Sequence, residues 1–318
     1  MTLVLDVTPT TIIERISSKI RRTWRDIQRR NLRKQFLNLP PSRALEVPQA
    51  FSIHMLLCGK DLEMGICAAK SFILASAQPF VFTFHDDGSL TPSDKDLLFF
   101  HFPKCIIIDY EDSLQKAKTY FGEQSEIYKM RLKGVMMLKL IDIKLFSDKK
   151  KAILIDSDIL FFDFPQEIFN AVNDPHFPNC FNRDIDTAYM TDQSVLERIC
   201  GHALPERINA GLSILNTDSI QFEVLENWLC EIRDQQIPII MHRIEQSLIS
   251  MLSTCSVYKT TYLPVSYDVS FFKDVHTSVC KHYVGRIRHG FEMEGLKYLL
   301  TERDFIQRWL KNIKDQEK

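Results

Sequence analysis

The feature that most constrains the fold of this chain is an alternation of short apolar runs with longer amphipathic segments, which begins at residue 51. The apolar runs occupy residues 52–58, 80–84, 105–108, 152–155, 211–215 and 257–263. Segments with helical periodicity lie between them, at residues 62–76, 126–146, 219–235 and 243–253. Parallel strands need crossover connections of about a dozen residues, which are usually helices. The alternation therefore predicts an α/β fold with a mostly parallel sheet.

Two more helical segments flank this region. Residues 8–39 place Trp24 and four isoleucines on one face, and Pro40 and Pro41 follow directly. Residues 295–314 form a second amphipathic pattern at the other end. Proline removes a backbone donor and ends a helix, so residues 40–50 are expected to be a linker. We divide the chain into a helix with its linker over 1–50, an α/β domain over 51–290 and a C-terminal helix over 291–318.

Composition narrows the class of protein. Hydrophobic residues make up 45% of the 318 residues, which is enough for a sizeable core. Glycine-rich phosphate loops of the P-loop and dinucleotide-binding types are absent from the sequence. The formal net charge of −1 argues against nucleic acid as a partner. Eight isolated cysteines, no apparent signal peptide and no apolar run of about 20 residues together predict a cytoplasmic protein.

The charge is unevenly distributed along the chain. Residues 14–34 contain nine basic side chains against Glu14 and Asp26, so this segment carries +7 and the remainder −8. A basic helix with an isoleucine and tryptophan face suits peripheral contact with the anionic inner face of a membrane, through residues 11–37. The alternative is that the isoleucine face docks on the α/β domain and the arginines are solvated. The sequence leaves both interpretations open.

The first candidate site follows the most apolar of the predicted strands, as Ile155-Asp156-Ser157-Asp158. Ligands of open α/β sheets bind at the carboxyl ends of the strands. Two carboxylates separated by one residue can converge on a hard cation such as Mg²⁺ or Mn²⁺. An aspartate-rich turn is the alternative explanation of this motif.

Three other polar segments occupy comparable positions. Asn209-Ala210-Gly211 begins an apolar strand, where the glycine lets another segment or a ligand approach closely, and a bulge at the entry to a core strand is the alternative explanation. The segment from His282 through Gly285 to Arg288 combines a metal-ligating imidazole with guanidinium groups that suit phosphate, although taken alone it is more typical of a solvated basic loop. Asp86-Asp87-Gly88 follows the second predicted strand and either contacts a nucleotide or forms a turn.

Taken in order, these motifs resemble those of the retaining glycosyltransferases of the GT-A fold, the group that contains glycogenin and the bacterial lipooligosaccharide galactosyltransferases. The resemblance covers residues 51–290 and includes a helix start at Glu245-Gln246, where the family has Asp-Gln. It implies a Rossmann-like α/β fold that uses a nucleoside diphosphate sugar as donor. It also implies a metal-dependent hexosyltransferase that acts with retention on an acceptor which the sequence does not identify.

The resemblance also implies roles for individual residues. Asp156, Asp158 and His282 are expected to hold Mn²⁺ or Mg²⁺. Gln246, Arg288 and Lys139 are expected to have catalytic roles. Contacts with the nucleotide sugar are expected from Gly59, Asp156, Ser157, Lys139, Asn209, Gly211, Glu245, Gln246, Gly285 and Arg288.

Two departures from the family pattern leave the donor sugar open. Glu245 replaces an aspartate, and Arg288 replaces a lysine that is followed by Pro-Trp in the family.

Alternatives to a UDP-sugar transferase also stay open at this point. They are a phosphatase of the haloacid dehalogenase type, which also has Asp-x-Asp after a strand, and a non-catalytic module that binds nucleotide sugars. A sugar-phosphate nucleotidyltransferase is disfavoured because its glycine-rich loop is missing. The sequence does not predict the oligomeric state.

Overall fold

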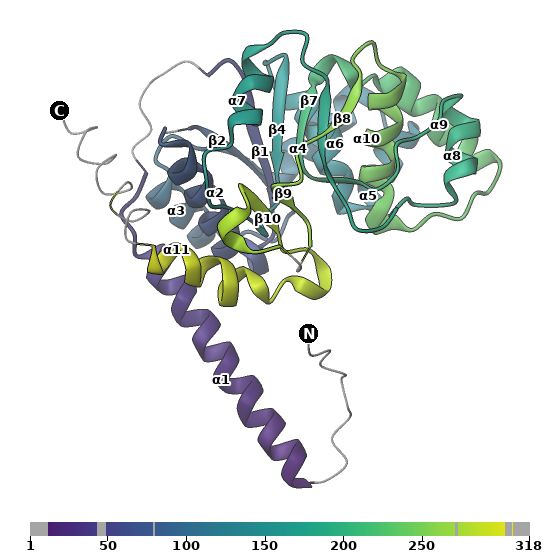
Figure 1. Cartoon of the computed structure of the whole chain (residues 1–318). Helices are drawn as coiled ribbons and strands as arrows, with labels where there is room; N and C mark the ends of the chain where they lie inside the picture. The colour runs from purple at the N-terminus through teal and green to yellow at the C-terminus, as the bar shows by residue number, and fades with distance from the viewer. Residues whose placement is uncertain (1–11, 43–48, 79, 271–272, 303–306, 308–318) are drawn as a thin grey trace.

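The computed structural model describes residues 12–42, 49–78, 80–270, 273–302 and 307. Its centre is a seven-stranded sheet in the order β3-β2-β1-β4-β7-β6-β8 (Figure 1). The strands of this sheet, in chain order, are β1 Ser52–Leu57, β2 Phe82–Asp86, β3 Ile106–Ile108, β4 Lys151–Ile155, β6 Asn179–Arg183, β7 Ile208–Asn216 and β8 Thr260–Tyr262. A smaller three-stranded sheet consists of β5 Ile159–Phe161, β10 Cys280–His282 and β9 Tyr267–Asp268.

The central sheet is mostly parallel, which confirms the predicted fold class. The pairs β1–β2, β1–β4, β2–β3 and β6–β8 are parallel. Only β7 departs from this pattern, because it runs antiparallel to both β4 and β6. The antiparallel strand carries Asn209 and Gly211 at its start, next to the carboxyl end of β4.

Helices cover both faces of the sheet. They are α2 Leu62–Ser76, α3 Pro92–His101, α4 Tyr110–Phe121, α5 Glu126–Lys133, α6 Leu138–Phe146, α7 Gln166–Asn173, α8 Gln193–Cys200, α9 Phe222–Asp234 and α10 Ile244–Cys255. Successive side chains of a strand point to opposite faces. Accordingly, Ile153 and Ile155 of β4 enter one apolar cluster, whereas Ala152 and Leu154 enter the other.

Two predicted elements differ from those observed. The helix expected over 126–146 is broken at Gly134, which ends α5 before α6 begins at Leu138. Glycine has a low helix propensity, and a Cβ here would lie 2.7 Å from Met241 Cε. The turn expected at Asp86 was also placed too early, because β2 extends through that residue and pairs with β1.

The C-terminal helix is described only in part. A π-helical turn, η7 (Phe291–Leu296), leads into α11 (Lys297–Thr301). Most of the remainder of the helix expected over 295–314 lies outside the described residues.

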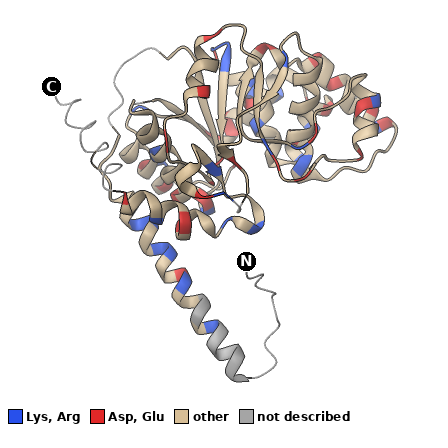
Figure 2. Ribbon diagram, viewed as in Figure 1, with Lys and Arg blue, Asp and Glu red and all other residues tan. Residues whose placement is uncertain are grey.

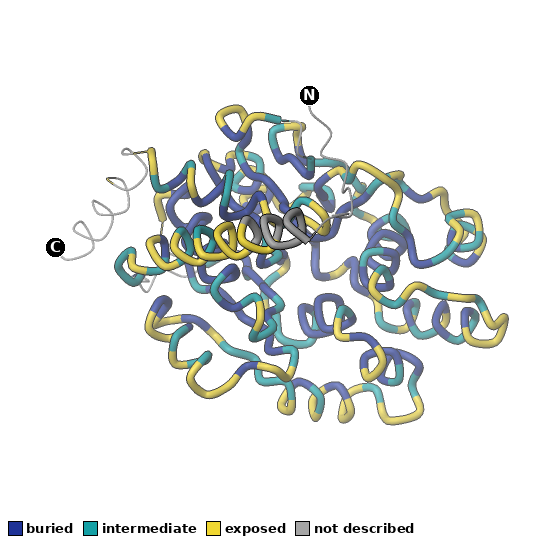
Figure 3. Tube along the Cα trace, turned by 90° about the horizontal axis from the view of Figure 1, so that it is seen from below, coloured by how far each residue is buried: buried dark blue, intermediate teal, exposed yellow. Residues whose placement is uncertain are grey.

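The long N-terminal helix, α1 (Ile12–Leu37), projects from the body of the molecule (Figure 1). Its C-terminal part packs on the body, where Phe36 is fully buried. Ile20, Trp24 and Ile27 are exposed, and Figure 3 shows this stretch of the helix largely in the exposed colour. The proposed docking of the isoleucine face on the α/β domain is therefore wrong for these three residues. No described helix combines the length and the apolarity needed to cross a membrane.

Candidate active site

A group of potential metal ligands forms where the two sheets meet. Asp156 and Asp158 follow the carboxyl end of β4 and lead directly into β5. The antiparallel register of β5 with β10 pairs Ile159 with His282, which brings the imidazole beside the aspartates. The backbone N–H of Asp156 donates to the Gly211 carbonyl at 2.8 Å, which fixes the turn against β7. One ligand-type atom from each of Asp156, Asp158 and His282 lies within 4.8 Å of the others.

The orientation of the imidazole leaves one nitrogen facing the carboxylates. His282 Nε2 lies 3.0 Å from Asp158 Oδ1 and 3.9 Å from Asp156 Oδ2. His282 Nδ1 lies 2.9 Å from Asn209 Oδ1, and Asn209 Nδ2 donates to Asp184 Oδ2 at 2.9 Å. Because an amide oxygen only accepts, Nδ1 carries the proton of the neutral ring and Nε2 is free to bind a metal.

The pKa values of the facing pair are shifted in opposite directions. Burial alone lowers the pKa of His282, but the negative charge of Asp158 outweighs it and raises that pKa above its ordinary value. Burial alone raises the pKa of Asp158, but His282 and Arg288 outweigh it and hold that pKa below its ordinary value. Each of the two side chains therefore stabilises the charged form of the other.

The absence of a side chain at Gly211 is required by this arrangement. A Cβ at this position would lie 2.3 Å from His282 Cε1 and 2.8 Å from Asp156 Oδ2. These separations are well inside van der Waals contact, so any other residue would displace the imidazole or the carboxylate. Carboxylate oxygens with one imidazole nitrogen are suitable ligands for Mn²⁺ and also for Mg²⁺. The residues present therefore fit a divalent cation.

Lys139 lies on the opposite side of Asp156. Its Nζ is 2.8 Å from Asp156 Oδ1 and 3.5 Å from Glu245 Oε1, and its side chain is almost fully buried. Burial lowers the pKa of Lys139, but the two carboxylates outweigh it and raise that pKa above its ordinary value. Burial raises the pKa of Glu245, and Lys139 only partly offsets this effect. The ammonium group of Lys139 is thus paired with the side chains of both Asp156 and Glu245.

Arg288 approaches the group from the solvent side. Its guanidinium lies 2.5 Å from Asp61 Oδ2 and 3.6 Å from Asp158 Oδ2, and 38% of its side chain is exposed. Gly285 adopts a left-handed backbone with φ of +57° and starts the short helical turn that carries Arg288 to this position. The aspartates themselves are partly exposed, with 25% of the Asp156 side chain and 13% of the Asp158 side chain accessible, so the group is open to solvent on this side.

Gln246 is held by the backbone on both sides of its amide. Its Oε1 accepts from the Ala210 N–H at 3.2 Å, and its Nε2 donates to the Ala188 carbonyl at 3.1 Å. These contacts place it beside Asn209 and Gly211 at the start of β7.

Two predicted residues have less direct links to the group. Gly59 follows β1, and its N–H donates to Ser89 Oγ at 2.8 Å. It starts the turn that ends at Asp61, which pairs with Arg288. Ser157 lies between the two aspartates and is mostly buried.

Comparison with solved structures identifies the fold. Mouse xyloside xylosyltransferase 1 in its apo form aligns over 74% of this chain and 97% of its own, with 13% identity and a TM-score of 0.50. The galactosyltransferase LgtC, in complex with donor and acceptor sugar analogues, aligns over 81% of this chain and 99% of its own, with 14% identity and a TM-score of 0.50. The chain has the GT-A glycosyltransferase fold. No protein-family model and no curated protein sequence matches it.

Two acidic residues in this GT-A domain are part of the site's network but were not predicted. Asp61 pairs with Arg288, and Asp184 accepts from Asn209. Asp61 could have been suspected from its place at a strand-to-helix junction, which is where sites of α/β sheets lie. Asp184 follows the carboxyl end of β6, in the polar segment 181–186, which is polar enough to line an acceptor cleft but is more typical of a surface loop.

Asp86, the last residue of β2, and Asp87 make contacts with the turn that follows the strand. Asp86 is buried, and its Oδ1 accepts from the N–H groups of Gly88 and Leu90 at 2.7 and 3.1 Å. Its other oxygen lies 3.2 Å from Lys95 Nζ. The carboxylate of Asp86 is therefore satisfied within the protein, which favours the turn interpretation for this residue.

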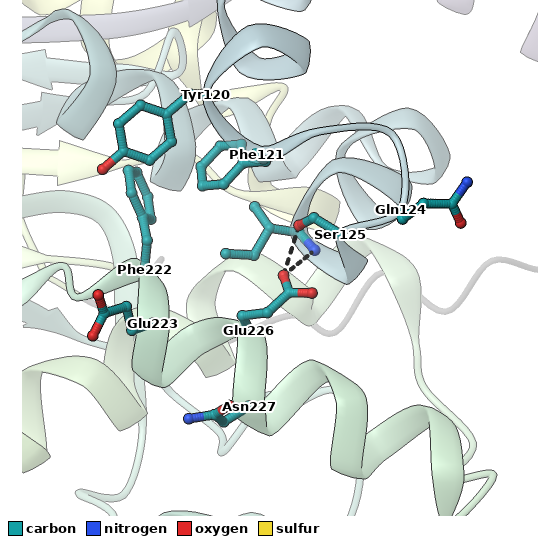
Figure 4. A pocket seen from close by; sticks show the side chains of 9 residues that line it. Tyr120, Phe121, Gln124, Ser125, Phe222, Glu223, Glu226 and Asn227 are labelled. Carbon is teal, nitrogen blue, oxygen red and sulfur yellow. Dashed lines mark hydrogen bonds between the residues drawn. The ribbon is translucent and has the colours of Figure 1, made fainter.

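Two hollows lie on the surface, and one of them is connected to the candidate site by a hydrogen bond. One, of 750 Å³, is lined by Tyr120, Phe121 and Phe222 together with Glu226 (Figure 4). Glu226 accepts from the N–H groups at the start of α5, so its charge stabilises that helix end. The other, of 480 Å³, is lined by Asp184 and by residues of the 262–273 segment. Only this second hollow includes a residue bonded to the candidate site.

Proposed function

We propose that this protein is a metal-dependent glycosyltransferase that moves a hexose-type sugar from a nucleoside diphosphate sugar, with UDP as the nucleotide, to an acceptor. The observation that carries the proposal is the convergence of Asp156, Asp158 and His282 on one point at the carboxyl end of β4. The GT-A fold supports it, because the two aligned structures are those of a xylosyltransferase and a galactosyltransferase. The fold gives no support to a phosphatase of the haloacid dehalogenase type.

On this proposal, the positive groups of the site act on the diphosphate. Cleavage of the bond to the sugar leaves negative charge on the departing phosphate, and preorganised positive charge lowers the energy of that transition state. A divalent cation on Asp156, Asp158 and His282 would supply most of this charge. Arg288 would turn its exposed guanidinium from Asp61 to the phosphate oxygens, which it can bind through two N–H groups. Asn209 would keep the proton on His282 Nδ1.

The residues around Lys139 are proposed to act on the sugar side. Lys139 lies beside Asp156 and Glu245 and holds both carboxylates in a fixed orientation. The carboxylates could then accept hydrogen bonds from the hydroxyl groups of the donor sugar. Gln246 is proposed to face the reacting carbon without attacking it, because an amide is a poor nucleophile. We propose that the transfer retains the configuration at that carbon.

The acceptor is proposed to enter from the hollow that Asp184 lines. Asp184 is bonded to Asn209, which in turn contacts His282, so this hollow adjoins the metal-ligand group. Its lining includes Tyr262 and Tyr267, whose rings suit the apolar faces of sugars.

The test is release of UDP from a panel of UDP-hexoses, with and without Mn²⁺, in the absence of any acceptor. We expect Mn²⁺-dependent release that falls by at least about 100-fold in Asp158→Asn, since this change removes a metal ligand and its charge. The matched control is Asp148→Asn, because that side chain is 81% exposed and pairs only with Lys149 among the described residues. Equal turnover in Asp158→Asn would refute the metal assignment. Binding of UDP and Mn²⁺ without any release would favour the non-catalytic module.

A further inference from the structure

Helix α1 is held on the body by one face of its C-terminal half. Arg29 Nε and Arg33 Nε lie 2.9 and 3.0 Å from the two carboxylate oxygens of Glu292, whose side chain is fully buried. Phe36 continues the same face into the apolar core. A buried carboxylate that meets two guanidinium groups is a strong anchor, because loss of either partner would leave charge uncompensated in the interior. These contacts fix which side of α1 faces the protein.

The apolar stripe of α1, defined as Ile20, Trp24 and Ile27, lies on the opposite side. Each stripe residue precedes one of the anchoring residues Arg29, Arg33 and Phe36 by nine positions. At 3.6 residues per turn, nine positions are about two and a half turns, which places the two sets on opposite faces. The exposed fractions of the three stripe residues, 63%, 61% and 51%, agree with their position on the face that points away from the body. The stripe therefore cannot reach the body while the anchor is intact.

The charge around the stripe indicates what covers it. Residues 14–34 contain nine basic side chains and two acidic ones. Figure 2 shows basic residues spread along the described part of α1, and the sequence from 19 to 37 has one acidic residue, Asp26. Such a helix repels a second copy of itself, whereas an anionic surface attracts it. Each basic residue near an anionic bilayer strengthens adsorption by about fivefold.

We propose that the apolar stripe of α1 lies in the headgroup region of an anionic lipid membrane, with the helix parallel to the surface. Tryptophan is favoured at this depth, and isoleucine gains by leaving water. Arginine and lysine side chains on the flanks would reach back to the lipid phosphates. The anchor on Glu292 then ties the body to the surface, four residues along the chain from Arg288 of the candidate site. This proposal does not depend on the proposed function.

The test is co-sedimentation of the full chain with two kinds of vesicle. One kind contains phosphatidylcholine alone, and the other contains phosphatidylcholine with about 30% phosphatidylserine. We expect binding to the anionic vesicles only, weakened by added salt because screening shortens the reach of the charges. The triple variant Ile20→Ser, Trp24→Ser and Ile27→Ser is expected to lose at least about tenfold in partitioning. The matched control is the double variant Phe100→Ser and Val257→Ser, which removes exposed apolar side chains elsewhere.

Three outcomes would overturn the proposal. The first is no binding of the wild type to anionic vesicles, and the second is equal binding by the wild type and the triple serine variant. The third is a lipid-free dimer that the triple variant abolishes, since a second copy would then cover the stripe. Unfolding temperature and circular dichroism of the variants report whether the fold is intact. Because all three stripe side chains are exposed, we expect both to match the wild type.

Discussion

Replacement of Gly211 by alanine tests whether the candidate site depends on a missing side chain. The added methyl group would lie 2.3 Å from His282 Cε1 and 2.8 Å from Asp156 Oδ2. Gly211 lies in β7, which is hydrogen-bonded to β4 on one side and to β6 on the other. The pairing with β6 is irregular at this point, but the Gly211 carbonyl accepts from the Asp156 N–H at 2.8 Å, which holds the backbone against the aspartate turn, so we expect the side chains of the site to move.

The magnitude of the effect follows from this contact. Carbon atoms pack at about 3.5–4.0 Å, so the imidazole must move by about 1 Å or more. A movement of this size breaks the 2.9 Å contact between His282 Nδ1 and Asn209 Oδ1. Loss of such a partner costs about 10–100-fold in metal affinity, and overpacking costs about 1–3 kcal/mol of stability.

The assay is calorimetric titration of Mn²⁺ into protein saturated with UDP, together with thermal unfolding in the absence of metal. Gly65→Ala is the matched control, because its Cβ would lie equally close, at 2.3 Å, to Leu57 Cδ2 in the core. We expect both variants to lose stability and only Gly211→Ala to lose Mn²⁺ affinity. Affinity in Gly211→Ala within twofold of the wild type would refute the reasoning, since the ligands would then tolerate the methyl group.

Three further predictions concern single buried groups. Asn209→Ala is expected to weaken Mn²⁺ binding by about 10–100-fold in the same titration, because it frees the His282 ring to rotate; an affinity within about twofold of the wild type would contradict this. Arg131→Met leaves the Asp142 carboxylate, 3.4 Å from Arg131 Nε, without that charged partner, and we expect urea denaturation to show a loss of about 3–5 kcal/mol. A loss below about 1 kcal/mol would contradict this. Burial, with Lys70, lowers the pKa of His101 to about 4, so the unfolded chain binds this proton more tightly than the folded one. Stability should fall as pH drops from about 6.5 towards 4, and less steeply in His101→Gln; equal slopes in the urea midpoint would disprove it.

Local patterns in the sequence were enough to predict the fold class. Short continuous apolar runs distinguish the strands from segments with a period of 3.6 residues, and the segment predicted as a helix over 62–76 is α2 with the same bounds. The break at Gly134 was missed because one glycine in a long periodic stretch is a weak signal. The short second sheet was missed as well, since strands of two or three residues carry too little periodicity to detect.

The candidate site was predicted in part, for a physical reason. Asp156 and Asp158 could be placed together because they are two residues apart at a strand end. Contact between His282 and Asp158 depends on the register of β10 against β5, and the network through Asp61 and Asp184 depends on how separate loops pack. Such contacts join residues far apart in the chain, which local patterns do not predict. His282 was placed with the aspartates only because the order of the motifs resembles that of a known family.

Helix α1 separates most clearly what the sequence determines from what the tertiary structure decides. The sequence by itself determined an amphipathic, strongly basic helix with Ile20, Trp24 and Ile27 on one face. It could not determine what that face meets, because helical periodicity describes a helix and not its neighbours. The tertiary structure decided the question through the buried carboxylate of Glu292, which binds Arg29 and Arg33 and turns the apolar stripe to the outside. A charge buried in the core requires its partners, and an exposed apolar face is the consequence.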